Sequence, residues 1–328
     1  MNISDIQQEP PAISVVIPVY NREDVILRAL SSLVTQDFKH PYEVIVVDDG
    51  STDQTAEMVA EYGRGIRLIR QENRGAHHAR RAGAKAATGE YIAFLDSDDE
   101  ALSTHLSAHY RTLQSHPQAI LSFAASQDRF GKQPLHLSHP ALLLAGTILD
   151  QPLLDFLEIG GFIFGMNVSL KREMFLELTD DMPDYWPAED IAFCLRASKQ
   201  GPFVSVGEVT QIRELRDDSV SRTMLSLQDT QCFLSMIEAW EMSPAFHTQE
   251  YQSYFRQAIR RYGPSATVYF LLQSRWQELR RMLRLTKCGF SYSYFRNLFR
   301  QLFSQSCGRL SSPHKPQRQP QRLAPTKL

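Results

Sequence analysis

Four carboxylates follow directly after a short apolar segment of the chain. The segment is residues 91–95, Tyr-Ile-Ala-Phe-Leu, and behind it come Asp96, Asp98, Asp99 and Glu100. Mg²⁺ or Mn²⁺ is usually held by one or two carboxylates together with the phosphates of a ligand. Such a cation would stabilise the charge that develops on a departing diphosphate. A solvated turn with an Asp that caps the next helix fits the same pattern.

A second acidic cluster, the pair Asp48 and Asp49, follows the apolar segment 42–47 and precedes Gly50. A carboxylate here can accept hydrogen bonds from a nucleobase N–H or from ribose hydroxyls. It can equally cap a helix beside a glycine turn. Because both acidic clusters follow apolar strands, a shared ligand site is favoured over two unrelated turns.

Alternating strands and helices position these acids. Apolar, β-branched segments predict strands at residues 13–17, 42–47, 66–69 and 91–95, and helical spacing predicts helices at about 21–36, 54–62 and 76–87. The alternation predicts an α/β fold with a mostly parallel central sheet flanked by helices. Ligands bind such sheets beyond the carboxyl ends of the strands, which is where both acidic clusters lie.

The pattern weakens beyond residue 115. We predict a strand at 120–124, a strand that carries Asn167, and a helix at 190–200. From about residue 226 the chain is rich in aromatic residues, and we predict a C-terminal helical extension there. The last stretch, 304–328, is rich in Pro, Gln, Ser and basic residues and is predicted to be disordered.

Composition excludes several protein classes. The 328-residue chain has no run of about 18 apolar residues that would predict a transmembrane helix, and its N-terminus does not resemble a signal peptide. Its 4 cysteines form no CxxC pair, so we expect reduced thiols in a cytoplasmic protein. Neither GxxxxGK(S/T) nor GxGxxG after a strand occurs, which excludes P-loop and dinucleotide-binding sites.

Charge is distributed unevenly along the chain. Residues 251–328 contain 15 Lys and Arg but one acid, Glu278, although the whole chain has a net charge of -2. For residues 255–303 two hypotheses stay open. The segment packs on the acidic catalytic part, or it lies on an anionic membrane surface at the inner face of the membrane. No recognition motif supports nucleic acid as a partner.

Four segments in order resemble the family 2 glycosyltransferases of the GT-A (Rossmann-like) fold. They are ISVVIPVYNREDVILRALSSLVTQDF, EVIVVDDGSTDQT, NRGAHHARRAGAKAATGEYIAFLDSDD and WPAEDIAFCLRASKQG, within residues 12–225. The resemblance implies an inverting transferase that uses a nucleotide-diphosphate sugar, with a UDP-sugar as the expected donor. It also implies Mg²⁺ or Mn²⁺ as cofactor and a glycan or lipid-linked acceptor.

The resemblance assigns roles position by position. Nucleotide contacts fall on Pro18, Tyr20, Asn21, Asp48, Asp49 and Arg80. Asp96 matches the acid for ribose and metal, and Asp98 matches the metal ligand. Asp190 matches the catalytic base, and inversion requires one base on the acceptor side. By itself, the Glu189-Asp190 pair is also explained as acids at a helix start.

Four further residues receive weaker assignments. Glu189 is expected to orient the site or the base. Trp186 is expected to stack on a sugar or to be buried in the core, and Asn167 to contact the sugar or to be an ordinary strand residue. Relatives often have a His where this chain has Arg216, and an Arg there would contact the diphosphate as a cation.

The resulting domain prediction has five segments. They are 1–11 (flexible N-terminus), 12–115 (nucleotide-sugar-binding half), 116–225 (acceptor-binding and catalytic half), 226–303 (basic helical region) and 304–328 (tail). Two other functions stay open: a non-catalytic relative that binds nucleotide-sugars, and a nucleotidyl- or phosphotransferase.

Overall fold

A computed structural model describes residues 10–63, 65–129, 136–137, 147–150, 152, 166–180 and 189–215. The predictions for Trp186, Arg216 and the segments 226–303 and 304–328 lie outside these residues. The same holds for the proposed membrane surface at 255–303 and for most of the predicted N-terminal segment.

The described strands form one sheet. They are β1 (Ile13–Val19), β2 (Tyr42–Asp48), β3 (Arg67–Arg70), β4 (Tyr91–Phe94), β5 (Glu100–Ala101), β6 (Leu121–Arg129), β7 (His136–Leu137), β8 (Ile148–Leu149), β9 (Val168–Lys171) and β10 (Phe203–Glu214). Their order is β3-β2-β1-β4-β9-β6-β10-β5, with β7 beside β6 and β8 beside β10. β3, β2, β1 and β4 run parallel, β9 lies antiparallel between β4 and β6, and β6 runs parallel to β10.

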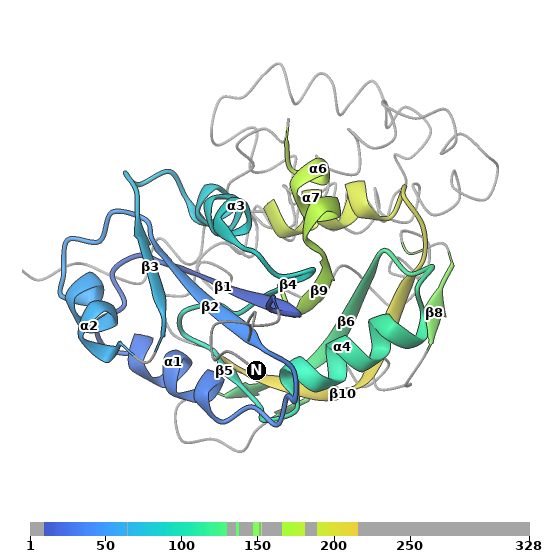
Figure 1. The fold of residues 1–328 in the computed structure, drawn as a ribbon, viewed down its shortest axis with the longest axis horizontal. Coiled ribbons are helices and arrows are strands. Elements are labelled where there is room, and N and C mark those ends of the chain that lie inside the picture. The colour runs from blue at the N-terminus through green and yellow to red at the C-terminus, as the bar shows by residue number, and fades with distance from the viewer. Residues whose placement is uncertain are drawn as a thin grey trace, which may run out of the picture.

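Helices cover both faces of the sheet (Figure 1). They are α1 (Ile26–Val34), α2 (Thr55–Tyr62), α3 (Ala76–Ala86), α4 (His105–Ser115), α6 (Arg172–Leu178) and α7 (Glu189–Ala197). α1, α2 and α4 lie on one face, and α3, α6 and α7 lie on the other. The α/β prediction is therefore confirmed, with an antiparallel strand at the centre of the sheet.

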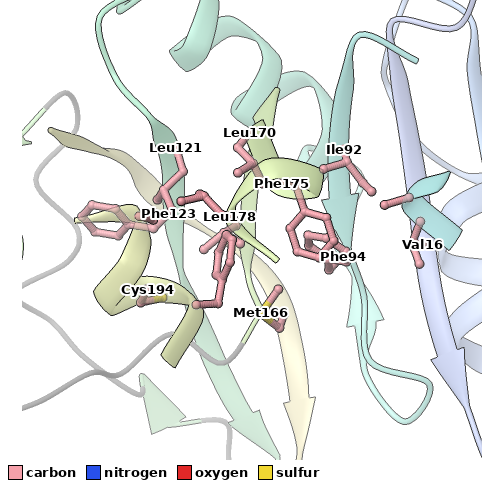
Figure 2. Packing of buried hydrophobic residues seen from close by; sticks show 14 of the residues in the cluster. Val16, Ile92, Phe94, Leu121, Phe123, Met166, Leu170, Phe175, Leu178 and Cys194 are labelled. Carbon is pink, nitrogen blue, oxygen red and sulfur yellow. The ribbon is translucent and has the colours of Figure 1, made fainter. Parts of the chain in front are cut away.

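Alternation along the strands fills two cores. Val16, Ile92 and Phe94 point to the face of α3, α6 and α7, while Val15 and Ala93 point to the opposite face. Because both faces are covered, the strands consist of continuous apolar residues. Figure 2 shows the first core, where side chains of α6 and α7 pack on the sheet.

Tilted aromatic contacts connect α7 to the sheet. The ring centroids of Phe94 and Phe175 lie 4.7 Å apart, and those of Phe175 and Phe193 lie 5.4 Å apart. This series runs from β4 through α6 to the middle of α7, so the position of α7 depends on the same strand that precedes the acidic cluster. α4 ends at Ser115, and the sheet includes strands from both sides of this residue.

Candidate active site

Three neighbouring strands end at the same edge of the sheet. In the β1–β2 register Val19 pairs with Asp48, and in the β1–β4 register Val16 pairs with Phe94. The pairing continues past the strands, because Asp49 N–H donates to Val19 O at 2.8 Å and Leu95 N–H donates to Val16 O at 3.2 Å. The structure thus brings the residues after β1, β2 and β4 together.

Asp48 is fully buried and supports the turn after β2. Its Oδ1 accepts a hydrogen bond from Ser51 N–H at 3.1 Å, and its Oδ2 accepts one from Arg70 Nε at 2.8 Å. Each carboxylate oxygen thus has a partner inside the protein. The turn that Asp48 supports carries Asp49.

Asp49 joins this edge to the start of α3. Its Oδ1 accepts hydrogen bonds from Gln71 Nε2 at 2.6 Å and Arg74 N–H at 3.0 Å, and its Oδ2 accepts one from Gly75 N–H at 2.7 Å. A carboxylate has about four acceptor positions, so one position remains beyond these three bonds. Neighbouring Gly50 has φ +81°, and a Cβ there would lie 2.9 Å from Asn73 N. The loop therefore requires glycine.

Asn21 links the ends of β1 and β2. It has a left-handed backbone with φ 48°, which a short polar side chain tolerates. Its N–H donates to Ser51 Oγ at 2.9 Å, and its Oδ1 accepts from Thr52 N–H at 2.8 Å. Just before it, Tyr20 is 43% exposed. Pro18 lies within β1, next to β2, and its ring has no N–H to donate.

The acidic cluster after β4 is held by three arginines. Arg80 is buried and donates through Nη2 to Asp96 Oδ1 at 2.7 Å, and Arg22 Nε lies 3.8 Å from Asp98 Oδ2. Arg28 Nη2 donates to the backbone oxygen of Asp98 at 2.8 Å. Asp96 and Asp98 are both half-buried, so their carboxylates also reach solvent.

Asp99 differs from these two acids because it is buried. Burial, and then the charges of Asp96 and Asp98, raise its pKa well above the usual value for an aspartate. Its Oδ1 accepts a hydrogen bond from Glu214 N–H at 3.0 Å. Asp99 thus attaches the acidic cluster to the end of β10, below the more exposed Asp96 and Asp98.

Asp96 and Asp98 fit a divalent cation that also has ligand oxygens. In the part of the chain that the structure describes, no three His, Cys, Asp or Glu side chains are grouped closely enough to hold an ion. Two half-exposed carboxylates one residue apart are hard oxygen donors, and Mg²⁺ is commonly bound by such a pair plus phosphate and water.

The predicted base lies on α7. Asp190 is half-buried in the first turn of this helix, where the helix dipole favours a negative charge. Burial and then the charge of Asp190 raise the pKa of the Cys194 thiol, one turn further on. Arg196 Nη1 donates to Leu178 O at 3.2 Å and ties α7 to α6. Glu189 is the first residue of α7.

α3 and α6 are also tied together. Arg81 Nη1 donates to Asp180 O at 2.8 Å, and Arg81 Nη2 pairs with the Asp180 carboxylate. The helices that carry Arg80 and Asp190 are therefore joined through the C-terminal end of α6, on one face of the sheet (Figure 1). The structure gives these two residues a shared face, which the sequence alone did not.

Asn167 lies at the centre of a buried network. Its Nδ2 donates to Ala125 O at 3.0 Å, and its Oδ1 accepts from Thr210 Oγ1 at 3.0 Å. The same Oδ1 lies 3.3 Å from Nε2 of His109. With zero exposure, Asn167 joins β6, β9 and β10 in the middle of the sheet. Asn167 lies just before β9, and its contact with the sugar stays a prediction.

Several residues around the acidic cluster were not found from the sequence. Four residues contact Asp98, Asp99 or Glu100: Arg22, Arg28, Arg129 and Glu214. Arg22 and Arg28 stand within the first motif that carries the family resemblance, but an arginine near a helix gives no periodic signal of its function. Arg129 and Glu214 lie at the ends of strands that pair only in the folded sheet.

Within the described residues, no helix has both the length and the apolar character needed to cross a membrane. The sequence profile of glycosyl transferase family 2 matches residues 14–178, about half of the 328 residues. This match includes Asp49, Asp96 and Asp98 and ends before Asp190.

Two curated proteins illustrate the sequence similarity. YibD of Escherichia coli K12, an uncharacterized glycosyltransferase, is 42% identical over 95 residues, which are 28% of this chain and 27% of that protein. EpsH of Bacillus subtilis 168, a putative glycosyltransferase, is 36% identical over 128 residues, which are 38% of this chain and 37% of that protein. The matches therefore cover less than half of these relatives' lengths.

A solved structure shows the shared fold. The crystal structure of Staphylococcus aureus TarS 1–349 in complex with UDP-GlcNAc has a TM-score of 0.55 and 19% sequence identity to this chain, and the match covers 85% of this chain and 93% of that chain. At this identity the likeness concerns the fold, and it confirms the predicted GT-A architecture.

Proposed function

The chain belongs to glycosyl transferase family 2, and we propose that it is an inverting, cation-dependent glycosyltransferase. It moves a sugar from a UDP-sugar to a hydroxyl group of a glycan or lipid-linked acceptor. One observation carries this proposal: Asp49, Asp96 and Asp98 lie at one sheet edge, where α/β folds bind ligands. The complex of TarS with UDP-GlcNAc supports UDP as the nucleotide of the donor.

The donor contacts follow from the geometry of the sheet edge. Asp49 has one acceptor position left after its three internal hydrogen bonds, and this position accepts the N3–H of uracil. Tyr20 is 43% exposed beside it and offers a ring for stacking on the nucleoside. Pro18 and Asn21 shape the same edge, and Asp48 holds the turn that presents Asp49.

Asp96 and Asp98 are the proposed ligands of Mg²⁺ or Mn²⁺. When bound, the cation neutralises the diphosphate and favours its departure. Arg80 donates to Asp96 Oδ1 and thereby fixes this carboxylate, and Asp96 Oδ2 is the proposed contact to the cation or the ribose. The two acids therefore orient the donor together, Asp98 through the cation and Asp96 through the cation or the ribose.

Asp190 is the proposed general base. As the acceptor oxygen bonds to the anomeric carbon, the bond from that carbon to the diphosphate oxygen breaks. The acceptor proton passes to the carboxylate of Asp190, and the electron pair leaves with UDP. Attack opposite to the leaving group inverts the anomeric centre, and a single carboxylate suffices, unlike the pair used by glycosidases. Glu189, Trp186 and Arg216 are assigned to the acceptor side by sequence similarity alone.

The basic segment 255–303 is proposed to attach the enzyme to the inner face of the membrane. Its support is the charge of the C-terminal region, which has 15 basic residues and one acid from 251 to 328. A lipid-linked acceptor would be reached from such a surface. Binding of the purified chain to vesicles with anionic lipid, and its loss when residues after 250 are removed, tests this part.

Titration calorimetry with UDP, GDP and dTDP tests the donor site, first with Mn²⁺ and then with excess EDTA. We expect UDP to bind tightly with Mn²⁺ and weakly with EDTA. Asp98→Asn should remove the effect of Mn²⁺, whereas Asp37→Asn, an exposed control outside the sheet edge, should retain it. If the folded wild type binds none of the three nucleotides, the proposal is wrong.

The released product then distinguishes the reaction class. With a panel of UDP-sugars and acceptors, a glycosyltransferase releases UDP. Release of pyrophosphate or phosphate would instead identify a nucleotidyl- or phosphotransferase. Tight UDP-sugar binding with no turnover across the panel would indicate a non-catalytic binding protein.

A further inference from the structure

Four charged side chains, among them Glu100 of the acidic cluster, form a closed ring of ion pairs. Arg28 Nε lies 2.9 Å from Glu100 Oε1, and Arg129 Nη1 lies 2.7 Å from the same oxygen. Glu214 Oε2 lies 3.0 Å from Arg28 Nη1 and 3.5 Å from Arg129 Nη1. We name these residues the arginine–glutamate ring. They come from α1, β5, β6 and β10, so the ring joins four elements that are distant in sequence.

The ring is bonded to the acidic cluster at two points. Arg28 Nη2 donates to the backbone oxygen of Asp98 at 2.8 Å, and this contact has hydrogen-bond geometry. The backbone N–H of Glu214 donates to Asp99 Oδ1 at 3.0 Å. The ring residues therefore hold the backbone of Asp98 and the side chain of Asp99. The Asp98 carboxylate is not part of these two contacts.

The ring holds the turn that carries a proposed metal ligand. The side chains of Arg28, Glu100, Arg129 and Glu214 are 34%, 22%, 27% and 13% exposed, and Arg129 contacts both oxygens of Glu100. A charge network with such a bidentate pair also stabilises the fold. A metal ligand must in addition be placed accurately, since Mg²⁺ requires near-ideal oxygen distances. A test of the positioning role therefore needs a readout that a loss of stability does not change.

Charge gives a second reason for the ring. Asp96, Asp98 and Glu100 carry like charges within five residues, and their repulsion would push the turn open. The ring places Arg28 against two residues of this run, at the Asp98 carbonyl and at the Glu100 carboxylate. Arg129 donates to both oxygens of Glu100, at 2.7 Å and 3.2 Å, so Glu100 is the shared partner of both arginines.

We infer that Arg28 is a positioning residue for the proposed cation site, acting through the backbone of Asp98. Its guanidinium holds the backbone that carries the Asp98 carboxylate, which would be a ligand of the cation. The inference rests on the proposed function, because it concerns the cation-dependent part of donor binding. It adds a residue of α1 to a site that sequence patterns place after β2 and β4.

The test compares the UDP affinity of the full-length chain in Mn²⁺ with its affinity in EDTA, by titration calorimetry. Arg28→Met keeps an unbranched apolar side chain and removes the guanidinium with its charge and donors. We expect this variant to lose about tenfold of the Mn²⁺-dependent gain in affinity, as is typical when the support of a metal ligand is removed. Its UDP affinity in EDTA should equal that of the wild type, which a general loss of structure would not leave unchanged.

Arg111→Met is the matched control. It removes an arginine whose Nη2 lies 3.0 Å from Glu208 Oε1, an exposed pair on α4 and β10. This variant should keep the full Mn²⁺-dependent gain. Arg28→Lys should restore part of the gain, because an ammonium can still donate to the Asp98 carbonyl but cannot contact all three partners.

Each other outcome overturns a distinct statement. If Arg28→Met retains the wild-type gain, the inference is wrong and the proposed function is unaffected. If the wild type binds UDP equally in Mn²⁺ and EDTA, the cation site and the inference both fail, but donor binding stands. If the wild type binds no UDP at all, the proposed function fails as well. Should Arg28→Met not fold, Glu214→Gln tests the same ring, and an unchanged gain there counts against the inference.

Discussion

Acidification is expected to destabilise this protein through two buried histidines of α4. His105 and His109 are fully buried, with ring centroids 5.1 Å apart. Nδ1 of His109 lies 2.8 Å from Ser122 Oγ, and its Nε2 lies 3.3 Å from Asn167 Oδ1. Burial lowers the pKa of His109 to about 4, and burial together with His109 lowers the pKa of His105 well below its usual value.

The direction of the pH effect follows from the charge of His109 in the folded and the unfolded chain. Above pH 6.5, the ordinary pKa of histidine, His109 is neutral in both states, so its titration does not change the free energy of unfolding. As the pH falls from 6.5 towards about 4, the unfolded chain binds a proton that the folded chain does not, so the free energy of unfolding decreases. pH 5 lies about 1.5 units below the pKa of 6.5 in the unfolded chain, so the free energy of unfolding has fallen there by about 2 kcal/mol. His105 adds a loss of the same sign.

The assay is urea unfolding of wild type and His109→Gln at several pH values between 8 and 5. Glutamine does not titrate and can still hydrogen-bond, so the difference measured at pH 8 reports the lost contacts. That difference should shift by about 2 kcal/mol in favour of the variant by pH 5. Equal pH dependence of both proteins, or an NMR titration that shows His109 protonated at pH 6 in the folded chain, would refute the reasoning.

Three further predictions concern the base, the core and the buried network. Asp190→Asn should abolish transfer while UDP binding by calorimetry is retained, and full activity of this variant would reject the base assignment. Gly83→Ala would place a Cβ 2.5 Å from Val16 Cγ1. We expect crowding of about 1–3 kcal/mol to outweigh the helix-propensity gain of about 1 kcal/mol, and Gly83→Ala to lower the melting temperature less in a Val16→Ala background than in the wild type. Asn167→Leu should lower the free energy of unfolding by about 3 kcal/mol or more, because several buried polar groups lose their partners; a change below about 1 kcal/mol would contradict the network's role.

Local patterns predicted the first half of the fold well. Strands and helices between residues 13 and 94 were expected at positions close to those in the structure, because both faces of this sheet are covered and its strands are continuously apolar. α4 was missed because His105 and His109 interrupt the apolar spacing on its buried face. β10 was missed because register shifts at Val209 disturb the alternation of its residues.

The sequence by itself determined the family and the sheet edge that carries the acids, since parallel strands place residues that follow them at one edge. Tertiary structure decided what each side chain does there. Asp48 and Asp49 are adjacent in sequence, yet one supports a turn and the other faces the start of α3. Arg28 and Glu214 meet at the acidic cluster only because α1 and β10 pack beside it. Such roles depend on partners far apart along the chain, which no local pattern encodes.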